Sequence, residues 1–218
     1  LKQTVFARLA NGREVVVQHT AVGELATEIA LLQAINIRTE IPVAVLLGSG
    51  ETVHPESDEQ RSYVIYERVD GFDLHTTFSD LAPPDRLVVA HTLGVYLGAL
   101  HRMFPFDRYG KVSTIDGELQ AQLPATPWRD WFKTYLQAGL ARLGTELTRG
   151  LPDIHNRLNF DGVPHDPPAA LFPWDFRPGN AILDRETGEL TAILDWGAPL
   201  AADPVLSFAK AEYLIADW

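Results

Sequence analysis

The sequence predicts an α+β protein of two lobes: a small N-terminal lobe of antiparallel strands with one helix, and a larger, mainly helical C-terminal lobe. Two observations predict this division. Short strand-like runs separated by turns fill the first part of the chain, and long segments with apolar residues at helical spacing follow. We place the lobes at residues 1–70 and 71–218, and expect natural residues to be missing at both ends.

The N-terminal lobe begins with a predicted β-hairpin. Residues 5–10 and 14–18 are rich in strand-forming side chains. Asn11 and Gly12 lie between them, the pair typical of a two-residue hairpin loop. The sequence therefore predicts an antiparallel ribbon at the start of the chain.

One helix and two further strands complete the predicted lobe. The helix covers residues 22–35, with Glu28 at the border of its apolar stripe. A carboxylate turned toward a core must find a donor or have its pKa raised. The strands cover residues 43–47 and 63–69, and the polar residues 48–61 between them read as a loop.

Two long helices dominate the predicted C-terminal lobe. The first covers residues 85–103, and the second, with the cleanest helical periodicity, covers residues 128–147. One face of the second helix is aromatic, with Trp131, Phe132 and Tyr135 in a single stripe. Such a stripe usually packs in a core, and the alternative is a stacking wall for a substrate.

Composition and charge exclude several classes of function. The formal net charge is −11, from 29 acidic and 18 basic residues, so we expect no nucleic-acid partner and no anionic membrane. No run approaches the roughly 18 uninterrupted apolar residues of a membrane helix. The chain has no cysteine and no closely spaced histidine pair, which argues against a thiolate or zinc site and fits a reducing, cytoplasmic environment.

The most informative residues are Asp175, Asn180 and Asp195. Asp175 precedes Asn180 by five residues, and Asp195 follows fifteen residues later at the end of a strand-like run. Phosphoryl transfer needs one carboxylate to accept the proton of the attacking hydroxyl, and an amide and a second carboxylate to hold magnesium on the nucleotide phosphates. The order and spacing match the kinase pattern.

Because of these three residues and the order of the predicted elements, the chain resembles the aminoglycoside phosphotransferase family. This family, also called choline kinase-like, has the protein-kinase-like fold. The resemblance covers nearly the whole chain, and residues 173–204 are its specific part. It implies ATP and magnesium as cofactors and a small-molecule hydroxyl as substrate. It further implies Asp175 as catalytic base, Asn180 and Asp195 as magnesium ligands, Glu28 as the partner of a phosphate-binding lysine, Glu67, Arg68 and Val69 as the adenine-binding hinge, and Asp203 as a support of the catalytic loop.

Two departures from the family pattern stand out. Pro173 and Trp174 replace the usual His-Gly before Asp175, which affects the support of the loop more than its chemistry. The lysine expected late in the second hairpin strand is absent, and Gln18 stands there instead. Gln18 can donate a hydrogen bond to a phosphate or to Glu28 but supplies no positive charge. The lysines of the chain are Lys2, Lys111, Lys133 and Lys210, and none is near Gln18 in the sequence.

Three hypotheses follow for the function. The first is a small-molecule kinase in which Arg177, on the Asp175 loop, contacts phosphate or substrate; a surface salt bridge is an equal alternative for Arg177. The second is a pseudokinase, a nucleotide-binding or regulatory module without catalysis, because the lysine is missing. The third is a metallohydrolase holding two metals on Asp175, Asp195 and Asp203. Substrate and oligomeric state are not encoded in any motif.

Overall fold

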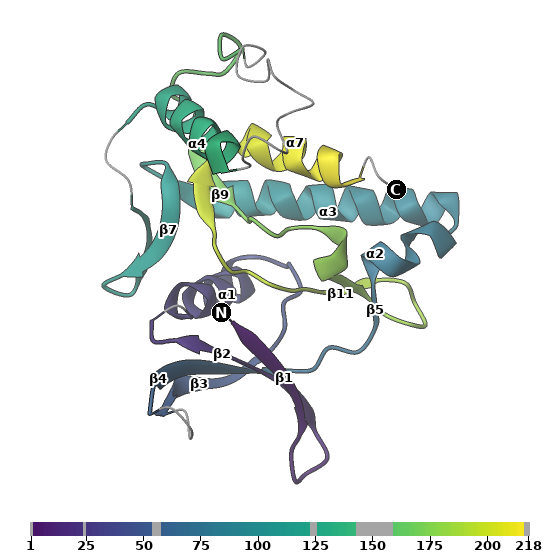
Figure 1. Ribbon diagram of the computed structural model, residues 1–218. Coiled ribbons are helices and arrows are strands. Elements are labelled where there is room, and N and C mark those ends of the chain that lie inside the picture. The colour runs from purple at the N-terminus through teal and green to yellow at the C-terminus, as the bar shows by residue number, and fades with distance from the viewer. Residues whose placement is uncertain (1, 24, 54–57, 123–125, 143–158, 216–218) are drawn as a thin grey trace.

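The computed structural model describes residues 2–23, 25–53, 58–122, 126–142 and 159–215. Figure 1 shows a twisted sheet with one helix beside it in the lower part of the view, and a group of helices in the upper part. Short strands and irregular segments connect the two parts. The predicted α+β, two-lobed arrangement is confirmed.

The lower part contains an antiparallel sheet with strand order β1-β2-β4-β3. Because consecutive strands β1 and β2 are neighbours, the predicted hairpin is present. β3 lies at one edge, with only β4 beside it. The strands are β1 (Gln3–Arg8), β2 (Glu14–Ala21), β3 (Leu46–Val53) and β4 (Gln60–Glu67).

The loop of the hairpin has three residues instead of the predicted two. The Leu9 amide donates a hydrogen bond to the Arg13 carbonyl at 2.8 Å, and the Gly12 amide donates to the Leu9 carbonyl at 2.9 Å. Gly12 has φ +85°, the left-handed conformation that a three-residue loop requires at this position. The register therefore pairs Thr4 with Gln18. A two-residue loop would shift this pairing by one residue and turn every side chain of β1 to the other face.

The predicted loop over residues 48–61 is wrong in its first half, because β3 continues to Val53. Gly50 explains the error. A Cβ at this position would lie 2.8 Å from the hydroxyl of Tyr63 on the neighbouring strand, so the close contact favours glycine. Glycine has low strand propensity, which hides the strand from a reading based on composition.

The helix α1 (Ala26–Arg38) is attached to the C-terminal part of the chain at two places. At its start, the Thr114 amide donates to the hydroxyl of Thr27 at 3.1 Å. After its end, the Ile193 amide donates to the Pro42 carbonyl at 2.8 Å. These contacts fix α1 relative to the segment that leads to Asp195. The buried residues of α1 are Glu28, Leu31, Leu32 and Ile35.

Helices form most of the upper part. α3 corresponds to the predicted helix at residues 85–103, and α4 to the one at residues 128–147, whose residues 143–147 lie outside the described ones. The helical elements are α2 (Leu74–Thr77), the 3₁₀ turn η1 (Phe78–Asp80), α3 (Pro83–Met103), α4 (Trp128–Arg142), the 3₁₀ turn η2 (Pro178–Asn180) and α7 (Pro204–Ile215).

Two small sheets support the loops between the helices. Most of their strands were not predicted from the sequence. Their strand orders are β11-β10-β5 and β6-β9-β12-β7-β8. The strands are β5 (Phe72–Asp73), β6 (Pro105–Phe106), β7 (Gly110–Ile115), β8 (Glu118–Ala121), β9 (Ala169–Phe172), β10 (Ala181–Leu183), β11 (Leu190–Ile193) and β12 (Leu200–Ala202).

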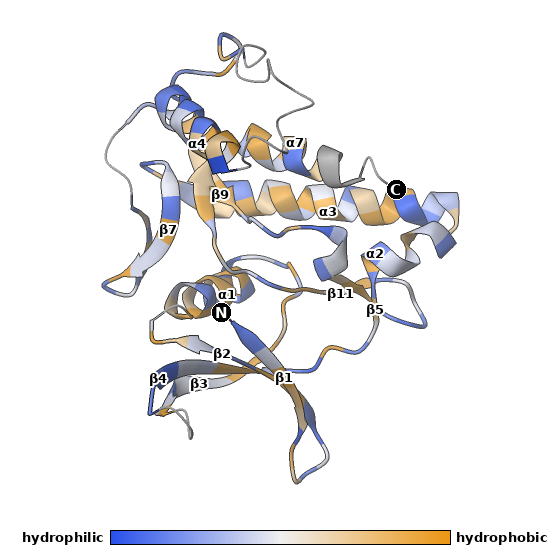
Figure 2. Ribbon diagram, viewed as in Figure 1, coloured by the Kyte–Doolittle hydropathy of each residue, from blue (hydrophilic) through white to orange (hydrophobic). Residues whose placement is uncertain are grey.

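One hydrophobic core joins the two parts of the molecule. It contains Leu32 and Ile35 of α1, Leu97 and Leu100 of α3, and Trp196 beyond β11. In Figure 2, hydrophobic residues are concentrated along α3 and along β9, inside the upper part. No helix among the described residues is both long enough and apolar enough to span a membrane.

Candidate active site

A cavity of about 290 Å³ lies where the sheet, α1 and the segment around Asp195 meet. Several of the predicted site residues line it together, although they are far apart in the sequence. Apolar side chains, among them Phe6, Val16 and Leu32, form other parts of the wall. The predicted residues at the wall are Gln18, Glu28, Glu67, Arg68, Val69 and Asp195.

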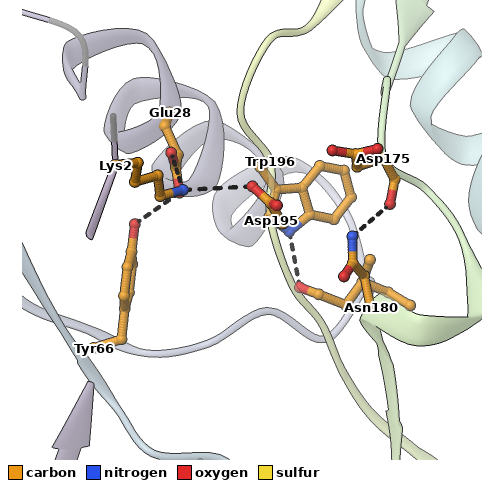
Figure 3. A network of polar contacts seen from close by, with 8 residues as sticks. Lys2, Glu28, Tyr66, Asp175, Asn180, Asp195 and Trp196 are labelled. Carbon is orange, nitrogen blue, oxygen red and sulfur yellow. Dashed lines mark hydrogen bonds and ion pairs between the residues drawn. The ribbon is translucent and has the colours of Figure 1, made fainter. Parts of the chain in front are cut away.

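The loop after β9 brings Asp175 and Asn180 together. The side-chain amide of Asn180 donates to the backbone carbonyl of Asp175 at 2.8 Å. The backbone carbonyl of Asn180 in turn accepts from the Leu194 amide at 2.7 Å. Asn180 is buried, and Figure 3 shows Asp195 on the segment beside it. The three residues of the predicted phosphoryl-transfer motif therefore converge.

A lysine from α7 lies near Asp175. The Lys210 ammonium is 4.4 Å from the ring centroid of Trp174 and 5.5 Å from that of Phe172. Burial lowers the pKa of Lys210; the charge of Asp175 opposes this effect and that of Arg177 adds to it. Among the described residues, the Asp175 carboxylate has no hydrogen-bond partner, so it is available to a ligand.

Arg177 lies exposed on the same loop. Its carbonyl accepts a hydrogen bond from the Asn180 amide at 2.9 Å. In the part of the chain that the structure describes, its guanidinium forms no salt bridge with a carboxylate, so the predicted alternative of a surface ion pair has no partner there.

The aromatic stripe of α4 starts in a core and ends beside the loop of Asp175. Trp128, 2% exposed, stacks with Trp131 at a centroid distance of 5.2 Å. Trp131 stacks with Tyr135 at 5.1 Å, and Tyr135 meets Trp174 edge to face at 6.3 Å. The stripe is thus core at one end, as predicted, while its other end adjoins the candidate site.

Glu28 points from α1 into the same region and has a lysine partner. The ammonium of Lys2 lies 3.0 and 2.9 Å from the two carboxylate oxygens of Glu28, and 3.4 Å from Oδ1 of Asp195. The Tyr66 hydroxyl donates to Glu28 at 3.2 Å (Figure 3). Lys2 is sixteen residues from Gln18 in the sequence, as the sequence analysis noted, but the hairpin pairs Thr4 with Gln18 and so brings the start of the chain beside β2.

Tyr66 remains a proton donor to Glu28. Burial is the main cause that raises the pKa of the Tyr66 hydroxyl, and the charge of Glu28, the hydrogen bond to it and the charge of Asp195 raise it further. A buried carboxylate is costly unless it is paired and hydrogen-bonded. Glu28, 5% exposed, meets both conditions through Lys2 and Tyr66.

Asp195 occupies a turn of unusual backbone conformation. Its φ is +58°, a left-handed conformation that aspartate tolerates better than most residues. The next residue, Trp196, anchors the turn. Its indole donates a hydrogen bond to the Ile193 carbonyl at 2.8 Å, and its ring meets that of Phe176 edge to face at a centroid distance of 6.3 Å. The Asp195 carboxylate stays exposed at the cavity.

The segment 67–69 lines the cavity while two of its side chains are held elsewhere. Glu67 pairs with Arg13 at 2.9 Å, and Arg68 pairs with Glu14 at 2.7 Å. The backbone is fixed as well, because the Glu67 amide donates to the Val45 carbonyl at 2.9 Å. The position of this segment at the cavity wall is therefore well determined.

Oxygen donors for a divalent cation are available at this site. Asp195 offers a carboxylate and Asn180 an amide oxygen, which are the hard ligands that magnesium prefers. Asp203, the third carboxylate of the metallohydrolase hypothesis, is buried at the start of α7 and accepts a hydrogen bond from the Val205 amide at 3.0 Å. Asp203 thus caps a helix.

Residues 2–211 match the sequence model of the "Phosphotransferase enzyme family". No curated protein sequence matches the chain.

Solved structures share the fold at low sequence identity. A thermostable mutant of aminoglycoside phosphotransferase APH(4)-Ia is 18% identical over 96% of this chain and 68% of its own, with a TM-score of 0.63. A putative aminoglycoside phosphotransferase from Ralstonia eutropha is 15% identical over 97% and 63%, with a TM-score of 0.66. Aminoglycoside phosphotransferase APH(3'')-Id from Streptomyces rimosus, in complex with ADP and streptomycin, is 16% identical over 99% and 78%, with a TM-score of 0.56. The chain thus spans between 63% and 78% of these proteins.

Proposed function

Because this chain belongs to the phosphotransferase enzyme family, we propose that it transfers the γ-phosphoryl group of ATP to a hydroxyl group of a small molecule. One observation carries this proposal: Asn180 contacts both the Asp175 loop and Leu194, which precedes Asp195, and Asp195 lines the cavity. These residues supply the base and the cation ligands that phosphoryl transfer requires.

In the proposed reaction, Asp175 accepts the proton of the substrate hydroxyl as that oxygen attacks the γ-phosphorus. Its carboxylate has no hydrogen-bond partner among the described residues, which leaves it free for the hydroxyl. Asn180 and Asp195 would hold Mg²⁺. The ion, when bound, neutralises charge on the phosphate oxygens.

The cavity is the proposed nucleotide site. Its apolar side chains suit the faces of adenine, and the segment Glu67 to Val69 would contact the edge of the base. The presence of ADP in the related Streptomyces rimosus protein supports this assignment. On this basis we propose the lobe boundary near residue 70, because the first sheet ends at Glu67 and β5 already pairs with β10.

The substrate would approach Asp175 from the side of α4 and α7. Tyr135 and Trp174 offer aromatic surface there, and Lys210 and Arg177 offer positive charge. Arg177 is proposed to contact the substrate or the transferred phosphoryl group, since it has no carboxylate partner in the described part of the chain.

A pseudokinase remains the second candidate, because Gln18 leaves the expected position in β2 without a cation. The two candidates differ in a direct measurement. Isothermal titration with ATP and Mg²⁺ measures nucleotide binding. A mass-spectrometric screen of hydroxyl-bearing metabolites should then detect a product that is heavier than its substrate by one phosphoryl group, about 80 Da. Magnesium-dependent binding with no product across the panel would favour the pseudokinase, and no nucleotide binding would refute both.

A further inference from the structure

We propose that Lys2, immediately before the first strand of the hairpin, is the phosphate-binding lysine of this protein and takes the role expected of the residue at position 18 in the second strand. This inference rests on the proposed function. In kinases the lysine that contacts the phosphates is held by a carboxylate of the N-lobe helix. Lys2 has this partner, because both oxygens of Glu28 lie within 3.0 Å of its ammonium.

The geometry of the sheet explains how Lys2, which lies next to β1, reaches the site expected for a residue of β2. Gln3 pairs with His19 and Thr4 with Gln18, and the same register extended by one residue puts Lys2 opposite Thr20. Residues opposite each other in an antiparallel ladder point to the same face, and diagonal neighbours are roughly 7–8 Å apart. Lys2 is therefore the diagonal neighbour of Gln18 on the face that lines the cavity.

No other lysine has comparable contacts. Lys133 lies over the Phe160 ring at 5.9 Å, and Lys210 lies over Trp174. Lys111 is exposed on β7. Of the cations that the structure describes, Lys2 is the one within 4.0 Å of the Glu28 carboxylate.

The position of the ammonium fits a phosphate ligand. It bridges Glu28 and the proposed magnesium ligand Asp195, at 2.9 and 3.4 Å. The Lys2 side chain remains 29% exposed, and both of its carboxylate partners, Glu28 and Asp195, line the cavity. A phosphate bridging Lys2 and a cation on Asp195 would have both of its charge partners in place.

Gln18 occupies the position in β2 where the phosphate-binding lysine is expected, and in this proposal Lys2 replaces that lysine. Its Oε1 is buried and has no hydrogen-bond partner among the described residues. A lysine at position 18 would face the same cavity as Glu28 and bring a second ammonium close to that of Lys2. Two neighbouring ammonium groups repel each other. We therefore expect the Glu28 site to accommodate a lysine at position 2 or at position 18, but not at both.

The test combines three variants in the full chain: Lys2→Met, Gln18→Lys and the double variant. The dissociation constant of Mg·ATP is measured by isothermal titration, with thermal unfolding in the absence of nucleotide. Loss of one charge-assisted contact should weaken Mg·ATP binding of Lys2→Met about tenfold to a hundredfold. The double variant should recover about tenfold of this loss or more, and Gln18→Lys alone should gain nothing.

Lys111→Met is the matched control, because it removes an equal charge from an exposed strand and should bind Mg·ATP like the parent. Equal affinity of Lys2→Met and the parent would overturn the role of Lys2 alone. A parent that does not bind Mg·ATP would overturn the proposed function together with this inference. If Lys2→Met does not fold, the double variant provides the test. It should fold and bind Mg·ATP. A double variant that folds but does not bind Mg·ATP would contradict the proposal that a lysine at position 2 replaces one at position 18.

Discussion

The side-chain amide of Asn180 donates a hydrogen bond to the backbone carbonyl of Asp175 at 2.8 Å. This contact uses the backbone of Asp175 and leaves its carboxylate free. It also uses the nitrogen of the Asn180 amide and leaves the oxygen available for a cation. A single hydrogen bond thus orients both residues for the different tasks that we propose for them.

Replacement of Asp175 by Asn should abolish phosphoryl transfer and leave the fold intact. The change removes the proton acceptor, which contributes about 10²-fold to 10⁴-fold in rate, while the backbone contact to Asn180 is retained. Product formation and thermal unfolding are the measurements. Asp107→Asn, at a side chain 86% exposed, is the control. Substantial residual turnover in Asp175→Asn would refute the role of the base.

Replacement of Asp195 should eliminate the magnesium dependence of nucleotide binding. Asp195→Gly is the better variant, because glycine removes the ligand oxygens and adopts the φ of +58° freely, whereas alanine there adds backbone strain of about 1–2 kcal/mol. The measurement is a magnesium titration at fixed ATP. Loss of the 3.4 Å contact to Lys2 should cost little stability, since this pair is exposed. An unchanged magnesium response would exclude Asp195 as ligand.

Removal of the Tyr66 hydroxyl should destabilise the fold. Tyr66→Phe deletes a donor to the buried carboxylate of Glu28, and hydrogen bonds to charged groups contribute about 1.5–3 kcal/mol. Chemical denaturation measures the change in free energy of unfolding. Tyr63→Phe, on the opposite face of the same strand, is the control and should change it by less. Equal effects of the two variants would show that the Glu28 contact contributes nothing.

Acidification should weaken the contact between α3 and α7 through His101. Nε2 of His101 lies 3.0 Å from the hydroxyl of the buried Ser207. Burial lowers the pKa of His101 below 6.5, helped by the charge of Arg102 and opposed by that of Asp203. The unfolded chain therefore binds the proton more readily than the folded one. The contribution of His101 to stability is complete above about pH 6.5 and is lost as the pH falls through its folded pKa.

This dependence is measured by denaturation between pH 5 and pH 8, with His101→Gln as the comparison. Glutamine retains a hydrogen-bonding group near Ser207 but does not titrate in this range. The stability of the parent should fall more steeply on acidification than that of the variant. Parallel curves for the two proteins would mean that His101 does not contribute to the pH dependence.

Local patterns in the sequence were sufficient for the motif and the long helices. Asp175 and Asn180 are five residues apart on one loop, so their spacing alone limits their geometry. The helical periodicity of α3 and α4 is equally local. The strand predicted at residues 43–47 overlaps β3 only at its start, and most of β3 was missed because the close approach of Gly50 to Tyr63 involves a neighbouring strand, which propensity does not register.

The sequence by itself determined the fold class and pointed to the three residues of the proposed phosphoryl-transfer motif, because these depend on spacing and periodicity along the chain. Only the tertiary structure decided which lysine meets Glu28. The extra residue in the loop at Gly12 sets the register of β1 against β2, and that register turns Lys2 to the face of Gln18. A shift of one residue reverses the face of every side chain in a strand, so a loop length that differs by one residue placed the ammonium in the site.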